Sequence, residues 1–245
     1  MNFFSKKKIL IFIPAYNVEK KIYSVISRIP SNIFYINNVN ILIINDFSSD
    51  NTNKVIKNIK NDFNYDIEVF ETKKNLGYGG VQKYAFNYAI KNQYDYIIML
   101  HGDGQYFPEK LPEFIEKFDN ANLDAVFGSR MKSYFSALRG GMPIYKFLGN
   151  IVLTFIQNMI LGSKMSEFHS GYRSYKVKSL QLIDFNKMTN YYHFDTEIII
   201  ELLKKNLLIL EINIPTFYGD EVSHLKSIPY GFKVLISTIK SKFKK

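Results

Sequence analysis

Short runs of β-branched and other apolar residues recur along the first half of the chain and predict buried strands. Their positions are apolar on both faces, which is typical of strands covered by helices above and below, as in parallel sheets. The predicted strands are Lys8–Ile13, Asn40–Ile44, Ile67–Glu71, Tyr96–Leu100 and Asp124–Phe127.

Amphipathic stretches with helical periodicity separate these runs, at Lys20–Arg28, Asn53–Asn61 and Gly80–Asn92. A helix between two strands of one sheet forms a right-handed crossover, which makes the two strands parallel. The pattern therefore predicts an α/β fold with a mostly parallel, doubly wound sheet that carries helices on both faces.

The alternation of strand and helix patterns loosens after about residue 130. Here the sequence predicts a helix over Ile144–Leu161, a loop at His169–Arg173, a helix near Asp195–Lys205 and a strand at Leu208–Ile214. Repeats, low-complexity tracts and Pro/Gly-rich linkers are lacking, so we interpret this part as the second half of a single domain.

Residues 230–245 have the pattern of a basic amphipathic helix. Its apolar positions are Phe232, Leu235, Ile236, Ile239 and Phe243, and five lysines lie elsewhere on the helix. The favoured interpretation is a helix that packs on its own domain and leaves a solvated lysine-rich end. The alternative is a helix that lies on an anionic membrane, and only the lysine excess supports it.

Composition narrows the function classes. The chain of 245 residues is 47% hydrophobic and carries a net charge of +10, which favours anionic partners such as phosphates, nucleotides, nucleic acid or an acidic membrane surface. It contains no cysteine, which excludes disulfides, thiolate zinc sites and a cysteine nucleophile. The four histidines lack the paired spacing of a zinc enzyme.

The N-terminus does not have the pattern of a signal peptide. Its charges follow its apolar residues, and the run Ile9–Ile13 stops at Pro14. The longest nearly apolar stretch, Ile151–Leu161, is shorter than the ~20 residues of a membrane-spanning helix. We expect a cytoplasmic protein whose contact with a membrane, if it has one, is peripheral, on the inner face of the cytoplasmic membrane.

The strongest candidate for chemistry is the His-Gly-Asp-Gly-Gln stretch that follows the strand Tyr96–Leu100. Ligands of open α/β sheets bind at the carboxyl ends of strands, and flanking glycines let a ligand approach closely. There Asp103 can hold Mg²⁺ or Mn²⁺ against a diphosphate, with Gln105 as a second oxygen ligand and His101 as a nitrogen ligand or hydrogen-bond donor. A simple Gly-Asp-Gly turn is the alternative.

Two more polar motifs follow the first two predicted strands. In the motif after the first strand, the ring of Tyr16 is suited to base stacking, and Asn17 and Glu19 offer polar contacts. In the stretch after the second, Asp46 can accept a hydrogen bond from a nucleobase, while the Ser-Ser-Asp residues behind it are typical of a helix cap. All three motifs are expected at one edge of the sheet.

These motifs, in order and spacing, resemble glycosyltransferase family 2, and in particular its dolichol-phosphate mannosyltransferase-like branch with the bacterial polyprenyl-phosphate sugar transferases. The resemblance covers nearly the whole chain, from about Ile9 to Lys226. Each motif is weak alone, and their common order makes the match specific. The stretches that carry it are Pro14–Asn17, Asn45–Thr52, Asn75–Gly80, His101–Gln105, Gly128–Arg130, Ser170–Arg173 and His193–Glu197.

The chain departs from the family pattern at three positions. Asn45 stands where the family has the first acid of an Asp-Asp pair, and His101 replaces the first acid of the Asp-x-Asp motif. Metal binding is therefore expected to rest on Asp103, Gln105 and the substrate diphosphate. Val18 occupies a position where many relatives have glutamate, which leaves Glu19 as the polar contact.

The resemblance implies a GT-A fold and an inverting transfer of a sugar from a UDP- or GDP-sugar to a polyprenyl phosphate, with a divalent cation. It implies a GT-A domain over residues 1–229, with a nucleotide-sugar half at about 8–130 and an acceptor half at about 131–229. The expected catalytic residues are Asp103 and Arg130. The expected donor-binding residues are Pro14, Ala15, Tyr16, Asn17, Glu19, Asp46, Gly80, Gly102 and Asp103.

The identity of the acceptor decides which other residues are needed. A polyprenyl phosphate is already ionised and requires cations, for which Arg130, Lys146 and Arg173 are candidates, although salt bridges to nearby acids are the structural alternative for the arginines. A sugar hydroxyl requires a general base instead. The candidates for a base or for a loop that closes on the donor are Asp195, favoured as a helix cap, and Asp220, Glu221, His224 and Lys226.

Other function classes fit the sequence less well. The first strand leads into Pro-Ala-Tyr-Asn rather than into the glycine fingerprint of dinucleotide-dependent oxidoreductases, and the phosphate-binding loop motif of NTPases does not occur. The aromatics are spread along the chain without a basic stripe, so we expect no nucleic-acid partner. An inactive relative that binds only lipid or a partner is the non-enzymatic alternative, because two familiar acids are replaced.

Overall fold

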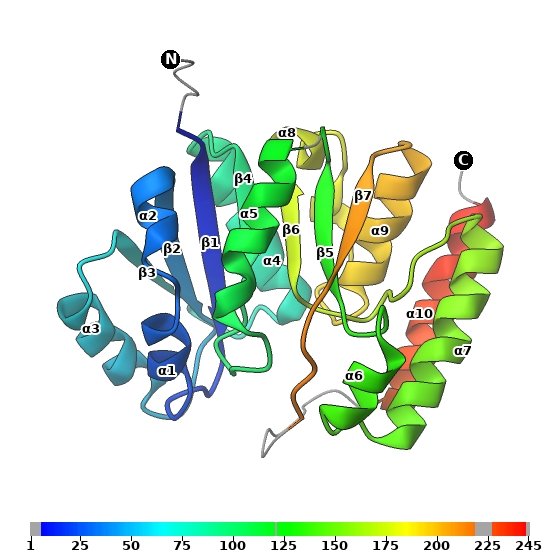
Figure 1. The fold of residues 1–245 in the computed structure, drawn as a ribbon, viewed down its shortest axis with the longest axis horizontal. Helices are drawn as coiled ribbons and strands as arrows, with labels where there is room; N and C mark the ends of the chain where they lie inside the picture. The colour runs from blue at the N-terminus through cyan, green and yellow to red at the C-terminus, as the bar shows by residue number, and fades with distance from the viewer. Residues whose placement is uncertain (1–5, 121, 219–226, 244–245) are drawn as a thin grey trace.

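The computed structural model describes residues 6–120, 122–218 and 227–243. Its centre is a seven-stranded sheet in the order β3-β2-β1-β4-β6-β5-β7, flanked by helices in front and behind (Figure 1). The strands are β1 (Lys8–Ala15), β2 (Asn38–Asn45), β3 (Ile67–Glu71), β4 (Tyr96–Met99), β5 (Ala125–Ser129), β6 (Arg173–Lys176) and β7 (Ile209–Asn213).

The sheet is parallel except at β6. Strand β1 pairs in parallel with β2 and β4, and β5 pairs in parallel with β7. Strand β6 lies antiparallel between β4 and β5. This confirms the prediction of a mostly parallel sheet and adds one reversed strand, whose first residue, Arg173, was predicted to lie in a loop.

Strand β1 shows why consecutive positions are apolar. Ile9, Ile11 and Ile13 belong to the hydrophobic core on one face of the sheet, whereas Leu10 and Phe12 belong to the core on the other. All five side chains are buried. A strand covered on both sides has no face left for polar residues, so the sequence does not alternate.

The helices are divided between the two faces of the sheet, as predicted. Apolar residues of α1, α2, α3 and α5 pack in the first core, and those of α4, α8 and α9 pack in the second. These helices are α1 (Ile22–Ser27), α2 (Asn32–Ile36), α3 (Thr52–Asp62), α4 (Tyr78–Lys91), α5 (Leu111–Asn120), α8 (Val177–Leu180) and α9 (Phe194–Lys204). Two short 3₁₀ turns lie at Pro108–Lys110 and Phe185–Lys187.

Three helices lie beyond the end of the sheet that carries β7. They are α6 (Tyr134–Arg139), α7 (Ile144–Leu161) and α10 (Ser227–Phe243), and α7 and α10 lie side by side at the edge of the molecule (Figure 1). Helix α10 also packs on α9. The described part of the C-terminal helix thus packs on its own domain, which was the favoured interpretation.

Helix α7 changes one expectation about membranes. By length and composition it is the one helix among the described residues that is long and apolar enough to cross a bilayer, with a mean hydropathy of 1.4. The nearly apolar stretch Ile151–Leu161 is by itself too short to cross a bilayer, which is why the sequence predicts no membrane-spanning helix. In the folded chain the helix packs along the domain through Asn150, Thr154 and Gln157, which are buried.

Candidate functional site

A cleft of about 920 Å³ lies at the carboxyl ends of β1, β2 and β4. One wall comes from the loops that follow these strands, and the other comes from α7, α10 and the segment before β6. The sheet edge predicted to gather the polar motifs is therefore the floor of one cleft. The predicted site residues that line it are Pro14, Ala15, Tyr16, Asn17, Glu19, Asp46, His101, Gly102, Asp103, Gln105, Arg130, Lys146 and Asp195.

Asp103 lies in a turn immediately beyond β4. Its Oδ1 atom accepts a hydrogen bond from the backbone N–H of Gln105 at 3.0 Å, and its Oδ2 atom lies 3.9 Å from Nδ1 of His101. The carboxylate is 36% exposed, whereas the imidazole of His101 is largely buried. The Gly-Asp-Gly turn is thus present, and it still leaves one carboxylate oxygen beside an imidazole nitrogen in the cleft.

The position of His101 decides which of its ring nitrogens faces Asp103. A Cβ atom on Gly171 would lie 2.7 Å from Nε2 of His101, so that nitrogen packs against the backbone of the opposite wall. Nε2 is buried and has no hydrogen-bond partner among the described residues, and the ring contacts Tyr106 edge-on. Nδ1 is therefore the nitrogen on the side of Asp103.

These two side chains fit a divalent cation that takes few ligands from the protein. Mg²⁺ and Mn²⁺ complete their coordination with waters and phosphate oxygens, and an imidazole nitrogen favours Mn²⁺. The described residues contain no group of three or more His, Asp or Glu side chains that could hold a metal by themselves. A site built from His101 and Asp103 therefore depends on oxygen atoms of a bound substrate.

The loop after β1 is bonded to the loop after β2. The side chain of Asn17 accepts a hydrogen bond from the N–H of Ser49, and the carboxylate of Glu19 accepts one from the N–H of Asn51. Asp50 accepts the N–H groups of Glu19 and Thr52, and these bonds lower its pKa against the opposing effect of burial. Asn17 and Glu19 thus hold the floor of the cleft together, a role that the sequence did not reveal.

Asp46 is buried and its carboxylate is largely engaged. Oδ1 accepts the N–H of Leu76 at 2.7 Å and the hydroxyl of Thr72 at 3.1 Å, and Oδ2 accepts the N–H of Gly77 at 3.0 Å. Gly77 has a φ of 77°, and a Cβ there would lie 2.8 Å from the carbonyl oxygen of Asn190. Asp46 therefore fixes the loop that begins α4 and keeps little capacity for a nucleobase.

Arg130 reaches the cleft from the end of β5 but is paired with a buried acid. Its guanidinium bonds the carboxylate of Glu167 through Nε and Nη2, and Nη1 donates to the Tyr218 hydroxyl at 3.1 Å. Coulombic attraction by Arg130 holds the pKa of Glu167 below its ordinary value although burial opposes it. The pair carries no net charge, and all three guanidinium nitrogens already donate to Glu167, Tyr218 or His169, so Arg130 adds little positive potential to the cleft and keeps few N–H groups for a ligand.

Arg173 does not line the cleft, which contradicts its predicted role in binding an acceptor phosphate. It is 1% exposed, donates to the carbonyl oxygens of Ser170 and Phe168, and lies 3.4 Å from the carboxylate of Asp195. The salt bridge named as the alternative is the one observed, because β6 turns the side chain of Arg173 into the interior.

Asp195 lies in the first turn of α9 without forming a capping bond, so the preferred prediction of a helix cap is wrong. Its carboxylate accepts hydrogen bonds from the Tyr78 hydroxyl at 2.7 Å and from Gln82 Nε2 at 3.0 Å, in addition to its ion pair with Arg173. Burial and the neighbouring Asp195 raise the pKa of Tyr78 well above its ordinary value. The cluster joins α4 to α9 beneath the cleft.

The wall made by α7, α10 and the segment before β6 contains Lys146, His169 and Tyr230. The ammonium of Lys146 lies 5.1 Å from the centre of the Tyr218 ring. Nδ1 of His169 and the hydroxyl of Tyr230 are 3.0 Å apart, and burial lowers the pKa of His169 to about 4. With His169 neutral and Arg130 paired, Lys146 supplies the net positive charge of this wall among the described residues.

Some predicted positions lie elsewhere. Gly80 is on α4 outside the cleft, where a Cβ would meet Leu76. Gly77 and Tyr78 line the cleft in its place. Asp220, Glu221, His224 and Lys226 lie outside the described residues.

Sequence reasoning missed Glu167, the Tyr78–Asp195 contact and the His169–Tyr230 pair. The only signal in the sequence was the position of Glu167 and His169 just before the recognised Ser-Gly-Tyr-Arg stretch. Each contact joins residues far apart along the chain, and a local pattern does not contain that information.

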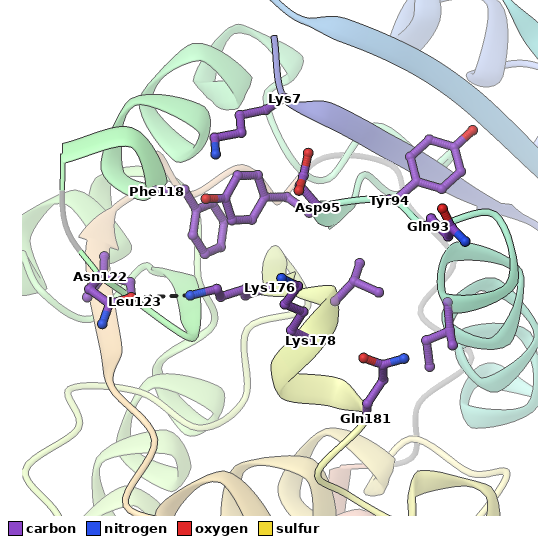
Figure 2. A pocket seen from close by; sticks show the side chains of 13 residues that line it. Lys7, Gln93, Tyr94, Asp95, Phe118, Asn122, Leu123, Lys176, Lys178 and Gln181 are labelled. Carbon is purple, nitrogen blue, oxygen red and sulfur yellow. Dashed lines mark hydrogen bonds between the residues drawn. The ribbon is translucent and has the colours of Figure 1, made fainter. Parts of the chain in front are cut away.

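A second hollow, of about 590 Å³, lies at the opposite edge of the sheet. Figure 2 shows three of the side chains that line this hollow. Lys7 precedes β1, Lys178 lies on α8, and Asp95 lies between α4 and β4. Lys176 donates to the side chain of Asn122 at 3.2 Å, and Asp95 accepts the N–H of Lys8 at 2.9 Å. The polar motifs of the sequence do not reach this hollow, so the cleft at the strand ends is the candidate site.

Known proteins resemble this chain over most of its length. The sequence model of the family described as "Glycosyl transferase family 2" matches residues 10–183. The chain is 28% identical over 240 residues to the UDP-N-acetylglucosamine–dolichyl-phosphate N-acetylglucosaminyltransferase of Methanococcus voltae, covering 93% of each chain. It is 23% identical over 224 residues to the undecaprenyl-phosphate mannosyltransferase of Micrococcus luteus, covering 89% of this chain and 87% of the relative.

The fold has solved counterparts. Glucosyl-3-phosphoglycerate synthase from Mycobacterium tuberculosis, crystallised with Mn²⁺, UDP and phosphoglyceric acid, superposes with a TM-score of 0.70 at 13% identity, covering 96% of this chain and 78% of that one. At this identity the match concerns the fold alone, and it confirms the predicted GT-A architecture.

Proposed function

This chain belongs to glycosyl transferase family 2, and we propose that it transfers a sugar from a UDP- or GDP-sugar to a polyprenyl phosphate with inversion at the anomeric carbon. The observation that carries the proposal is that a single cleft holds Asp103 on its floor and Lys146 on its opposite wall. A donor diphosphate needs a carboxylate that can hold a divalent cation, and an acceptor phosphate needs a positive charge. Asp103 offers the first and Lys146 the second in the same cleft.

On the donor side, we assign the diphosphate to the His101–Asp103 corner and the base to Tyr16. The ring of Tyr16 is 41% exposed at the edge of the cleft, which leaves it accessible to a stacking partner. A divalent cation bound at the corner would neutralise charge on the departing diphosphate. Asp103, with Gln105 holding its Oδ1 atom, would present its other carboxylate oxygen there.

On the acceptor side, Lys146 supplies the positive charge, and Arg130, whose Nη1 donates to Tyr218 at the cleft, can add at most the remaining N–H of that nitrogen. In the proposed reaction, an acceptor phosphate oxygen attacks the anomeric carbon and forms the new C–O bond. The bond from that carbon to the donor phosphate oxygen breaks, and the nucleoside diphosphate leaves with the electron pair. Lys146 would bind the attacking phosphate through its ammonium group.

Two observations favour a phosphate acceptor over a sugar hydroxyl. A lipid phosphate is ionised near neutral pH and needs no general base, whereas a hydroxyl acceptor does. Asp195, the carboxylate of the described residues proposed for that role, is instead bonded to Tyr78, Gln82 and Arg173. The names of both relatives given above also contain polyprenyl phosphates.

The direct experiment is to incubate the full chain with Mn²⁺, polyprenyl phosphate and each of a set of UDP- and GDP-sugars, and to identify the product by mass spectrometry. We expect one lipid-phosphate sugar whose formation stops with EDTA. Transfer only to a glycan hydroxyl would refute the acceptor. Failure to turn over any donor would favour an inactive relative.

Asp103→Asn is the matched test of the site. It removes a charged ligand without changing size, and we expect transfer to fall by roughly 10²–10³-fold, as when a transition-state charge loses a stabilising group. The control is Asp184→Asn, which should leave transfer unchanged, because in the described part of the chain Asp184 forms its ion pair only with the exposed Lys187. Full activity of Asp103→Asn would show that the centre lies elsewhere.

A further inference from the structure

Helix α7 has its polar side chains inside and its apolar side chains outside. Asn150, Thr154 and Gln157 are its buried residues, and each forms a hydrogen bond within the protein. The opposite face is exposed and consists of large apolar side chains at the spacing of one helical stripe. These are Ile144, Leu148, Val152, Phe155 and Met159.

Helix α10 repeats this arrangement. Its buried residues are Val234 and Thr238, and Thr238 donates its hydroxyl to the carbonyl of Val234 within the helix. Its exposed apolar residues follow the same spacing as those of α7, at Ile228, Phe232, Ile236, Ile239 and Phe243. A helix that faces water normally has the reverse pattern, so both faces indicate an apolar environment outside the protein.

The two helices lie side by side. Gln157 of α7 donates to Thr238 of α10, and Leu153 of α7 lies against Gly231 of α10. Figure 1 shows the pair at the edge of the molecule, on the far side from β3. Together with α6, which exposes Tyr134 and Leu138, they carry more than half of the exposed large apolar side chains of the described chain.

The charged residues of these segments themselves have one sign. Residues 131–166, which include α6 and α7, and the described helix α10 contain no aspartate or glutamate. They do contain exposed cations, among them Arg139, Lys164, Lys233, Lys240 and Lys242. Apolar side chains on helices that carry cations and no acids are complementary to a surface that is apolar within and anionic at its border, which is the interface of an anionic bilayer.

The same helices form a wall of the cleft. Tyr145, Lys146 and Leu153 of α7 line it, as do Ser227 and Tyr230 of α10. Apart from Leu153, which lies at the middle of α7, these residues lie in the first halves of their helices, so the exposed faces continue directly into the mouth of the cleft. A lipid held in a bilayer under these helices would have its head group next to Lys146.

We propose that α7 and α10 together form the surface by which this protein binds an anionic lipid bilayer, with the mouth of the cleft against the membrane. Binding needs only the exposed faces and lysines. The use of the surface, to take a lipid phosphate from the bilayer, rests on the proposed function. A second copy of the chain fits the surface less well, because a two-fold contact would place the same acid-free, lysine-bearing helices against each other.

Vesicle sedimentation tests the proposal. The full chain is mixed with vesicles of phosphatidylcholine alone or with phosphatidylglycerol, and the bound fraction is measured. We expect binding to the anionic vesicles that weakens with added salt. The double variant Phe155→Ser/Phe232→Ser removes two rings that are each 65% exposed, and it should lower the affinity by roughly tenfold or more.

The matched control is Tyr35→Ser/Ile36→Ser, which removes two equally exposed apolar side chains at the end of α2. It should bind as the unchanged protein does. Because all four side chains are exposed, both variants should keep the same melting temperature. Equal vesicle affinity of the two double variants would overturn the proposal, and so would equal binding to neutral and anionic vesicles.

Two further measurements separate the outcomes. Light scattering after gel filtration would reveal a dimer, and a dimer that Phe155→Ser/Phe232→Ser converts to monomers would assign the faces to a second copy and overturn the proposal. Transfer to a short-chain prenyl phosphate in detergent tests the chemistry without a bilayer. Vesicle binding without any transfer would refute the proposed function and leave the membrane-binding surface standing. Transfer in detergent without vesicle binding would refute the membrane-binding surface and leave the proposed function standing.

Discussion

Two buried arginines show how single residues in this protein are held in place. Arg130 is paired with Glu167 and Arg173 with Asp195, and all four side chains are nearly inaccessible to solvent. A charge without water is tolerated only when opposite charge and hydrogen bonds surround it. Asn150 meets this need by donating a further bond to Glu167. Removing one partner therefore leaves a buried charge unpaired.

Glu167→Gln should destabilise the fold by about 3–5 kcal/mol, because Arg130 loses its counter-charge in the interior. Arg28 and Glu109 form a bidentate pair with two 2.8 Å contacts at the surface. Glu109→Gln should cost only ~0–1 kcal/mol, since water replaces the lost partner. Urea unfolding of both variants measures the difference, and similar losses would mean that burial does not set the energy of the Arg130 pair.

His169 should make stability depend on pH. Burial, with Arg130 and Arg173 nearby and Glu167 opposing them, lowers its pKa from 6.5 to about 4. Between these values the unfolded chain binds a proton that the folded chain does not, so stability is lost as the pH falls. The loss attributable to His169 between pH 7 and pH 5 should be up to about 2 kcal/mol.

His169→Asn is the matched variant, because its amide can replace Nδ1 in the contact with Tyr230. Unfolding free energies of both proteins across pH 5–7 isolate the contribution of His169 from that of the other titrating groups. The stability difference between them should shrink as the pH falls. Parallel curves would show that His169 is not held neutral.

At the scale of elements, position in the fold decides what a residue pattern means. The apolar stripe of α7 has helical periodicity and predicted the helix bounds correctly, yet the stripe faces outward. The buried strand runs likewise predicted β1 to β5 and β7 within a few residues of their bounds. Helices α2, α5, α6 and α8 were missed, and so was β6, which is short and contains two basic residues.

Glycines in two helices should respond in opposite ways to alanine. A Cβ at Gly79 of α4 would lie 2.4 Å from the carbonyl oxygen of Thr189 and 2.9 Å from Phe194, whereas nothing lies within 4 Å of a Cβ at Gly149 of α7. Gly79→Ala should destabilise by about 1–3 kcal/mol through overpacking. Gly149→Ala should stabilise by roughly 0.5–1 kcal/mol through helix propensity. Urea unfolding checks both, and changes of the same sign would contradict the packing argument.

At the scale of the whole molecule, the two predicted halves share one sheet. Strand β6 follows α7 in the chain but pairs with β4 and β5 of the first half, and β7 completes the edge beside β5. The nucleotide-sugar and acceptor halves are therefore not separate folding units. The same pairing brings the segment before β6 to the cleft, where Gly171 packs against His101.

The sequence by itself determined the parallel strands, the helices α1, α3 and α4 between them and the edge where the polar motifs gather. Buried parallel strands need consecutive apolar residues, and ligands bind where such strands end. Both signals therefore lie in residues that are neighbours in the sequence. Tertiary structure decided the rest: Arg173 and Asp195 became an interior pair, Asp46 a loop anchor, and α7 a helix with its apolar side outward. These outcomes depend on which distant segments meet, and no local pattern records that.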